Sequence, residues 1–308
     1  MKTSISRRQF IRTSLAAPFI VSSLPRTAWA AAGTMKLAAF ADEISPKLDE
    51  QIRVCKELGI RFFELRGVAG KNVMDFDAPL RTEVRAKLQE NGMGVASIGS
   101  PIGKAKITDP WPAYFDKFKL AVELAEFFSA PLIRIFSYFP PAKGHEISQH
   151  RDEVMRRMQA KADYVKGHPV TLVHENEKDI YGEHGPACLD MLKTVNSPKL
   201  RCAFDFANFV VAGDDTLKNW EMLKPYVVHI HIKDYKRETK KIVPAGQGDG
   251  NIQTILEDAK KSGYDGFLTL EPHLRVAGKS SGETGPELFK VATDALRGVC
   301  RKAGIQLQ

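Results

Sequence analysis

The chain has 308 residues, of which 27% are charged, and a formal net charge of +8 at neutral pH. Residues 1–30 hold five basic side chains and no acid, so the rest of the chain carries a formal charge of only about +3. A charge this small argues against a nucleic-acid-binding protein. The four cysteines show no paired spacing, so we expect buried thiols and no disulfide framework.

Residues 1–30 have the features of an export signal. Ser6-Arg7-Arg8-Gln9-Phe10 has the twin-arginine form, and a modest apolar run extends from it to about Leu24. This run is far shorter than the roughly 20 residues that span a bilayer. We therefore expect a twin-arginine signal peptide, cleaved near Ala30. A short amphipathic anchor is the alternative. As a signal, this segment implies contact with the twin-arginine export machinery, a periplasmic or secreted mature protein, and no stable membrane anchor.

Residues 31–308 alternate between strand-like and helix-like segments and form one predicted domain. The strand-like segments are 35–40, 61–65, 94–98, 131–136, 170–176, 202–206, 228–234 and 267–272. Helical periodicity follows each of them: from about 46 to Gly59, over about 80–92, and near 112–128, 148–166, 186–195, 216–223, 252–262 and 285–303. This alternation predicts an α/β fold, a closed (β/α)₈ TIM barrel rather than an open doubly wound sheet. No Gly-x-Gly-x-x-Gly follows the first strand, which argues against nucleotide binding.

Each of the last four strands ends in a residue that commonly binds metals. These residues are Glu175, Asp205, His231 and Glu271, spaced about 25–40 residues apart, as successive βα units require. The carboxyl ends of barrel strands converge on one mouth, so the four side chains can meet a single cation. Taken singly, each acid could instead be a helix N-cap or a solvated loop residue. Burying three acids together is unfavourable without a cation, and this mostly oxygen set suits Mn²⁺ best, with Mg²⁺, Co²⁺ or Zn²⁺ as alternatives.

Three further motifs are similar to those of a known family. They are His229-Ile230-His231-Ile232-Lys233-Asp234, the Gly-rich segment 246–252, and the segment 263–271 with Gly-Tyr-Asp-Gly at its start and Glu271 at its end. With them the chain resembles the xylose-isomerase-like TIM-barrel superfamily of sugar isomerases and epimerases over nearly all of residues 35–303. The resemblance implies a metal tetrad on Glu175, Asp205, His231 and Glu271, with the two glutamates as the acid/base pair of epimerase members. Tagatose and psicose epimerases carry His three residues after the metal Asp, whereas this chain carries Asn208.

Other polar residues near strand ends are candidates for binding a substrate. They are Glu64, Arg66, Lys104, Asn208, His229, Lys233 and His273. Lys104 could equally be a solvated lysine, and His229 could lie in a deeper layer than the substrate. Arg134, inside the fourth strand, either pairs with an acid or faces the mouth. By strand alternation, His174 should point toward the helices.

The chemistry that follows is proton transfer next to a carbonyl. A divalent cation on the carbonyl and hydroxyl oxygens of a sugar acidifies the neighbouring C–H, and two carboxylates can remove and return the proton through an enediolate. The first hypothesis is a metal-dependent sugar isomerase or epimerase acting on a small-molecule carbohydrate. The alternatives are a lyase or hydrolase acting by β-elimination on 3-keto-glycosides, and a non-catalytic periplasmic sugar-binding barrel. The sequence does not decide between a monomer and a homo-oligomer.

Overall fold

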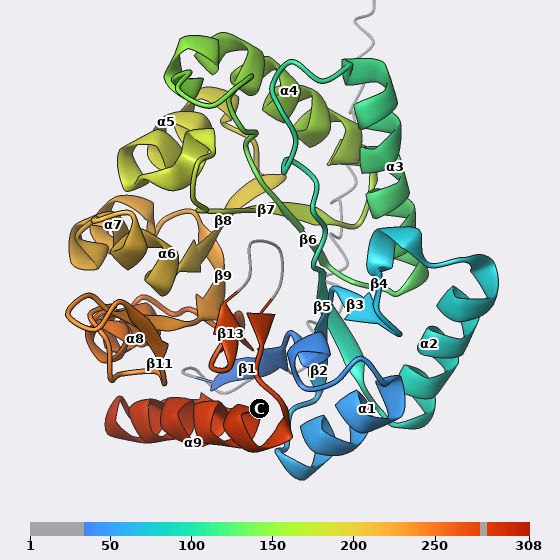
Figure 1. Ribbon diagram of the computed structural model, residues 1–308, viewed down its shortest axis with the longest axis vertical. Helices are drawn as coiled ribbons and strands as arrows, with labels where there is room; N and C mark the ends of the chain where they lie inside the picture. The colour runs from blue at the N-terminus through green and yellow to red at the C-terminus, as the bar shows by residue number, and fades with distance from the viewer. Residues whose placement is uncertain (1–33, 278–281) are drawn as a thin grey trace, which may run out of the picture. The chain divides into compact units, whose positions relative to one another are not determined.

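A computed structural model describes residues 34–277 and 282–308 (Figure 1). The predicted signal at residues 1–30 lies outside this range. Among the described residues, no helix has the length and apolar character needed to cross a membrane.

The eight predicted strands form a closed parallel barrel. They are β1 (Thr34–Ala39), β2 (Phe62–Leu65), β5 (Gly94–Ile98), β6 (Leu132–Ile135), β7 (Thr171–Glu175), β8 (Leu200–Asp205), β9 (Val227–Ile232) and β12 (Phe267–Leu270). Each pairs with the next in parallel, and pairing of β12 with β1 closes the ring. The predicted TIM barrel is therefore confirmed.

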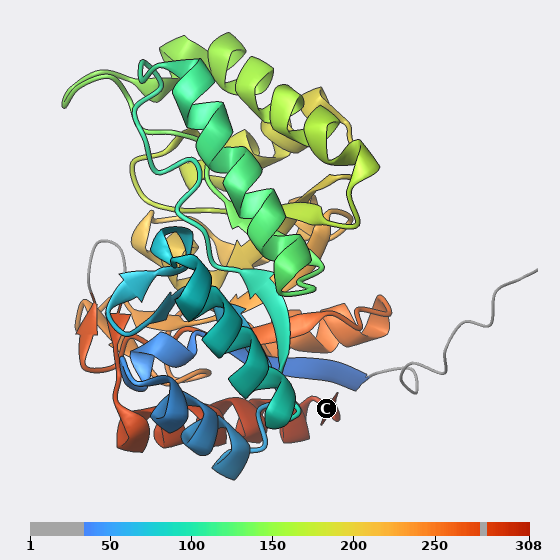
Figure 2. The same ribbon diagram turned by 90° about the vertical axis from the view of Figure 1, so that its right-hand side faces the viewer.

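The helices form a layer outside the strands (Figures 1 and 2). They are α1 (Leu48–Glu57), α2 (Ala78–Glu90), α3 (Trp111–Phe127), α4 (Arg151–Tyr164), α5 (Gly185–Val195), α7 (Thr216–Leu223), α8 (Ile252–Lys261) and α9 (Pro286–Lys302). Side-chain caps fix where some of them begin: Asp77 accepts the N–H of Leu80 at α2, and Asp215 accepts the N–H of Leu217 at α7. All eight lie where the sequence periodicity placed them, with small shifts at their ends.

Several short elements were not predicted from the sequence. They are α6 (Phe206–Val211), the hairpins β3–β4 (Gly67–Val68, Lys71–Asn72), β10–β11 (Asp234–Lys236, Lys241–Val243) and β13–β14 (Val276–Ala277, Gly282–Glu283), and β15 (Gln306–Leu307). Strands of two or three residues are too short to show a period-two pattern. The three hairpins follow β2, β9 and β12, so they extend the carboxyl ends of barrel strands.

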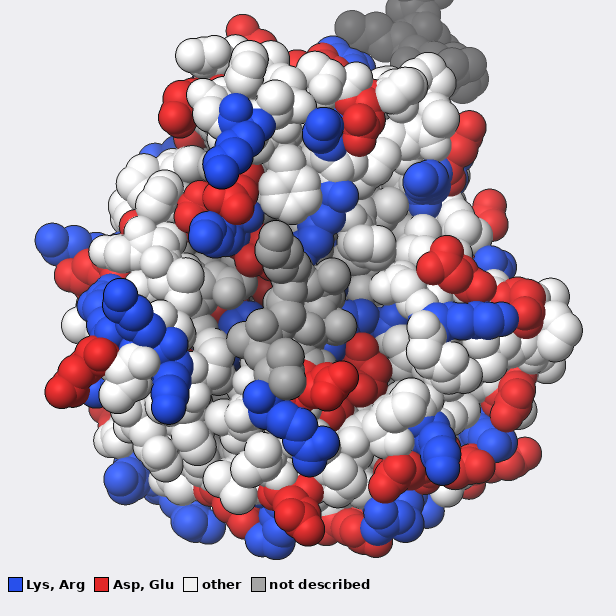
Figure 3. All heavy atoms as spheres, in the orientation of Figure 1, with Lys and Arg blue, Asp and Glu red and all other residues white. Residues whose placement is uncertain are grey.

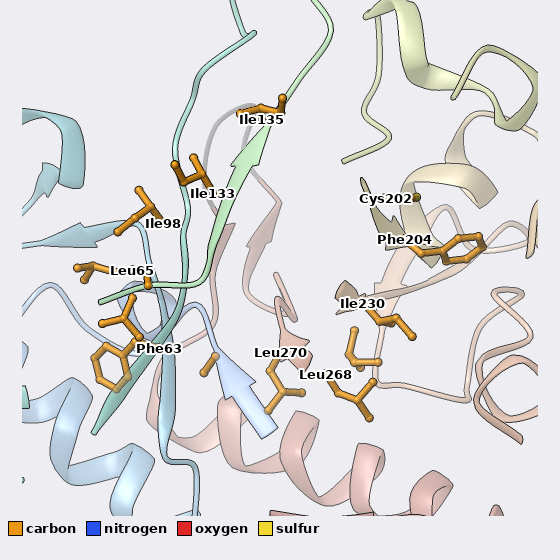
Figure 4. Close-up of a cluster of buried hydrophobic side chains, with 14 of the residues drawn as sticks. Phe63, Leu65, Ile98, Ile133, Ile135, Cys202, Phe204, Ile230, Leu268 and Leu270 are labelled. Carbon is orange, nitrogen blue, oxygen red and sulfur yellow. The ribbon is translucent and has the colours of Figure 1, made fainter. Parts of the chain in front are cut away.

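Strand alternation divides the apolar side chains into two clusters. One face of the strands packs with apolar residues of the helices, and Figure 4 shows members of this cluster such as Phe63, Ile133 and Leu270. The other face forms a separate, smaller cluster inside the barrel, made of Ala38, Ala96, Leu132, Val173, Ala203 and Phe267. The barrel interior is therefore a packed core, and the polar side chains on the same strand faces stand above it.

The Gly-rich segment predicted to be part of a family motif wraps around Asp234. The Asp234 carboxylate accepts backbone N–H groups of Gly246, Gly248 and Gly250 at 2.9, 2.9 and 3.0 Å. A Cβ on Gly248 would lie 2.2 Å from Asp234 Oδ1, so only glycine allows this close approach. The motif therefore anchors the loop between β11 and α8.

Candidate metal centre

The four residues predicted to bind a metal converge at the barrel mouth. Each of Glu175, Asp205, His231 and Glu271 offers a ligand atom, and these atoms all lie within 4.8 Å of one another. All four residues are buried, with exposed fractions of 3% or less. The group joins the ends of β7, β8, β9 and β12, as strand alternation requires.

His231 is oriented with one ring nitrogen toward the acids. Nδ1 lies 3.1 Å from Glu175 Oε1, 3.7 Å from Glu271 Oε2 and 4.0 Å from Asp205 Oδ2. Among the described residues, His231 Nδ1, Glu175 Oε2 and Asp205 Oδ2 are buried and form no regular hydrogen bond, although each lies within 3.2 Å of an oppositely charged group. Buried polar atoms normally form hydrogen bonds, so these three atoms are candidates for binding a cation.

The ends of β7 and β8 are locked together by side-chain amides. Asn176 bonds both backbone groups of Asp205, at 3.0 Å to its N–H and 3.1 Å to its carbonyl oxygen. Asn208 donates to the carbonyl oxygen of Asn176 at 2.9 Å and to Glu175 Oε1 at 3.4 Å. Asp205 Oδ1 accepts the N–H of Asn208 and so caps α6, while Oδ2 faces the centre. The Asp205 carboxylate therefore serves as an N-cap through Oδ1, while Oδ2 remains a candidate metal ligand.

Three buried cations surround the acids. Lys233 Nζ lies 2.9 Å from Asp205 Oδ2 and 3.1 Å from Glu271 Oε2. Arg134 Nη1 lies 3.2 Å from Glu175 Oε2, and Arg66 Nη1 lies 3.0 Å from Glu271 Oε1. The sequence left open whether Arg134 pairs with an acid or faces the mouth. Arg134 does both, because the acid with which it pairs lies at the mouth.

These charges shift the pKa values of the acids in different directions. Burial raises the pKa of Glu175, but His231 and Arg134 outweigh it and lower this pKa to about 2. Burial and the nearby carboxylates raise the pKa of Asp205 to about 6, despite Lys233. For Glu271, Lys233 and His273 outweigh burial and hold the pKa well below its usual value. The acids therefore differ in how firmly they are held ionised.

A deeper layer of polar side chains supports His231. Glu64 Oε2 lies 2.6 Å from His229 Nε2 and 3.2 Å from His231 Nε2. All three side chains are fully buried. Glu64 and His229, both predicted to contact a substrate, thus lie beneath His231 and contact each other.

His273 lies beside Glu271 and is held by the first βα loop. Its backbone N–H donates to Glu43 Oε2 at 2.9 Å, and its Nε2 lies 3.2 Å from Glu43 Oε1 and 3.5 Å from Glu271 Oε1. Burial lowers the pKa of His273, but Glu271 and Glu43 outweigh it and raise this pKa to about 9. The backbone φ of His273 is 45°, in the left-handed region that residues other than glycine rarely adopt. His273 is thus positioned by its strained backbone and by the Glu43 carboxylate from the loop after β1.

The remaining predicted substrate residue, Lys104, lies at the edge of the group. Its Nζ is 2.8 Å from Glu177 Oε2, and its side chain keeps 17% exposure. Sequence reasoning missed Asp42, Glu43 and Asn176. Asn176 comes directly after β7, and Asp42 and Glu43 lie three and four residues beyond the end of β1. A search for polar residues in the loops after barrel strands could therefore have selected them as well.

The residues fit a divalent cation. Three carboxylates and one imidazole nitrogen offer ligand atoms within 4.8 Å of one another, and all four residues are buried. This mostly oxygen set suits a divalent cation, which would be held by Glu175, Asp205, His231 and Glu271. Two other acid–histidine groups occur among the described residues, Glu64-His229-His231 and Glu43-Glu271-His273, but each has three members rather than four.

The face of the molecule that carries the mouth mixes charges of both signs. Figure 3 shows basic and acidic side chains interspersed over this face. A continuous basic surface of the kind that contacts nucleic-acid phosphates is not seen on it.

The amino-acid sequence matches one protein family and two curated relatives. A model of the family described as "Xylose isomerase-like TIM barrel" matches residues 52–298. A 3-dehydroshikimate dehydratase from Bacillus anthracis is 24% identical over 165 residues, 48% of this chain and 58% of that protein. An uncharacterized protein from Methanocaldococcus jannaschii is 23% identical over 149 residues, 46% of this chain and 51% of that protein. The chain thus matches a little over half the length of each relative.

Solved structures share the fold over almost their whole length. A probable 3-DHS dehydratase from Bacillus anthracis has a TM-score of 0.68 at 17% identity, covering 85% of this chain and 98% of that chain. A 3-keto-D-glucoside 4-epimerase from E. coli has a TM-score of 0.66 at 15% identity, covering 87% and 99%. A xylose isomerase-like barrel from Mycobacterium smegmatis, solved in complex with magnesium, has a TM-score of 0.66 at 17% identity, covering 87% and 97%.

Proposed function

The chain belongs to the xylose isomerase-like TIM barrel family, and on this basis we propose that it is a metal-dependent enzyme that moves a proton next to a carbonyl of a small carbohydrate. The main support for this proposal is the group of Glu175, Asp205, His231 and Glu271, whose ligand atoms lie within 4.8 Å of one another. Epimerisation or isomerisation is the first candidate, because a solved structure of the same fold is a sugar epimerase.

These four residues would hold the ion. Mn²⁺ is the expected metal, and Mg²⁺ is the first alternative because a structure of the same fold contains it. When bound, a divalent cation polarises the carbonyl oxygen and stabilises the negative charge that follows loss of the neighbouring proton.

Glu175 and Glu271 would act as the acid/base pair. They end β7 and β12, which β8 and β9 separate in the sheet, so they approach the mouth from different sides. Arg134 keeps Glu175 ionised and able to accept a proton from carbon. Glu271 lies 3.5 Å from His273 Nε2, and protonated His273 can pass a proton to it for return to the substrate.

The test is solvent deuterium exchange into candidate sugars. The full chain, reconstituted with Mn²⁺, would be incubated in D₂O with free ketoses and with 3-keto-glucosides, and deuterium would be measured by mass spectrometry. Exchange at the carbon next to the carbonyl is expected, and Glu175→Gln or Glu271→Gln should abolish it. Exchange that survives both substitutions would contradict the acid/base pair. Tight sugar binding without any exchange would favour a binding protein.

β-Elimination is the second candidate, because the Bacillus anthracis relative is a dehydratase. Elimination needs an acid for the leaving oxygen as well as a base for the proton. Lys233 is such an acid, since its ammonium lies beside Glu271 and Asp205 at the mouth. Release of water or of an aglycone from a 3-keto-glucoside, lost in Lys233→Met while deuterium exchange persists, would distinguish elimination from epimerisation.

We also propose that residues 1–30 direct export by the twin-arginine route. The support is the Ser6-Arg7-Arg8-Gln9-Phe10 motif and the following apolar run. Replacing Arg7 and Arg8 with lysine should retain the protein in the cytoplasm. Unchanged recovery from the periplasm after this replacement would contradict the proposal.

A further inference from the structure

Two histidines of β9 share one carboxylate oxygen beneath the candidate metal centre. Glu64 reaches them from β2, which is not a sheet neighbour of β9, so its side chain crosses the barrel interior. Its Oε2 lies 2.6 Å from His229 Nε2 and 3.2 Å from His231 Nε2. A separation of 2.6 Å is that of a direct, charge-assisted hydrogen bond, so these three residues form an anchor rather than a second metal site.

The anchor determines what His231 offers at its other nitrogen. A neutral imidazole carries one proton, and a carboxylate at Nε2 holds the proton there and leaves a lone pair on Nδ1. Nδ1 of His231 is the buried ring nitrogen that faces Glu175, Glu271 and Asp205, at 3.1, 3.7 and 4.0 Å. The edge of the Phe40 ring, 5.3 Å away centroid to centroid, restricts the tilt of the imidazole.

We propose that Glu64 is a positioning residue that holds the His231 proton on Nε2 and so presents Nδ1 to a divalent cation. The inference rests on the proposed metal centre and adds a residue that does not touch the metal. Partners of this kind usually tune metal affinity, because they fix both the tautomer and the ring orientation of the ligand.

His229 holds Glu64 in place. Its Nε2 contacts the same Glu64 oxygen and also lies 3.2 Å from Thr269 Oγ1, while its fully buried ring faces away from solvent. This arrangement makes His229 a support for Glu64 rather than a contact for a substrate. Thr293 is equally buried, but its hydroxyl donates to the carbonyl oxygen of Phe289 at 2.8 Å, within α9. It therefore offers a matched control for a buried polar substitution outside this layer.

The first measurement is Mn²⁺ affinity by calorimetric titration of the full chain. Glu64→Gln keeps the shape but removes the charge, and it should weaken Mn²⁺ binding about 10–100-fold. Glu64→Asp keeps the charge on a shorter side chain and should fall between this variant and the wild type. Thr293→Val should bind Mn²⁺ as the wild type does. Circular dichroism and thermal unfolding check that each variant is folded, and Glu64→Asp serves as the test if Glu64→Gln does not fold.

The second measurement reads the tautomer directly. In Mg²⁺-loaded wild type, nitrogen-15 NMR of the imidazoles should place the His231 proton on Nε2, and Glu64→Gln should lose the strongly hydrogen-bonded proton signal. A purely structural role for Glu64 would change the unfolding temperature but neither of these readouts.

The outcomes separate this inference from the proposed function. Wild-type affinity retained in a folded Glu64 variant, or a His231 proton found on Nδ1, would overturn the positioning role and leave the metal centre standing. Absence of Mn²⁺ binding in the wild type would overturn both.

Discussion

The two halves of the barrel contribute different residues to the mouth. The second half, from β7 to β12, supplies the predicted metal set, Glu175, Asp205, His231 and Glu271. The first half, from β1 to β6, supplies Arg66 and Arg134, which pair with the glutamates of the second half across the interior. The second half thus carries the predicted ligands together with Lys233, and the first half adds two arginines that pair with these ligands. Substitutions in the two halves should therefore have different effects.

The largest expected effect is on the rate of proton transfer and comes from a substitution in the second half of the barrel. Glu175→Gln should lower solvent deuterium exchange by about 10²–10⁴-fold, because a neutral amide cannot accept a proton from carbon. Exchange rates measured at saturating Mn²⁺ separate this loss from weaker metal binding. Glu126→Gln is the matched control, since Glu126 lies on the outside of the barrel with a side chain 41% exposed. Equal losses in the two variants would argue against a specific role for Glu175.

The next largest effect is on the free energy of unfolding and comes from a substitution in the first half of the barrel. Arg66→Met removes the cation that Asp42, Glu43 and Glu271 share. Glu43 and Glu271 keep His273 and Lys233 beside them, but Asp42 loses its ion pair, and breaking a buried ion pair typically costs about 3–5 kcal/mol. Urea denaturation of the metal-free protein measures the loss. Arg53→Met removes an arginine that is 55% exposed and should change stability by less than about 1 kcal/mol. A loss no larger for Arg66 than for Arg53 would mean that the first half does not hold the acids.

A smaller effect comes from Lys161, a buried lysine outside the mouth. Within the part of the chain that the structure describes, its Nζ has no hydrogen bond and no acid partner, and it lies 4.7 Å from the centroid of the Tyr138 ring. Lys161→Met should therefore stabilise the protein at neutral pH by about 1–3 kcal/mol.

The stabilisation expected from Lys161→Met depends on pH, and the pKa of Lys161 sets the direction of this dependence. Burial, with help from Arg157, lowers the pKa of Lys161 from 10.5 to about 7. Between these values the unfolded chain binds a proton that the folded protein does not, so the contribution of Lys161 to stability rises with pH across this window. The advantage of Lys161→Met over wild type should shrink as pH rises from about 7 to 10. Urea denaturation of wild type and Lys161→Met at several pH values measures the difference in their free energies of unfolding. Lys119→Met, at an exposed lysine, is the control. A difference that does not change with pH would contradict the prediction.

The sequence predicted the second half of the mouth better than the first. Each metal-set residue ends its own strand, so alternation and spacing alone were enough to select it. The partners in the first half act through contacts between residues far apart in the chain, such as Arg66 with Glu271, 205 residues apart, and His273 with Glu43, 230 apart. A sequence pattern does not show which distant side chains meet, so these pairings and the depth of Glu64 and His229 needed the folded barrel.

The most direct test of the account is the position of a bound ion. Crystals of the full chain grown with Mn²⁺ would be examined for anomalous scattering from manganese. The account predicts a single strong peak within bonding distance of Glu175, Asp205, Glu271 and Nδ1 of His231. A peak beside Glu43 and His273 instead, or no peak in Mn²⁺-saturated crystals, would contradict it.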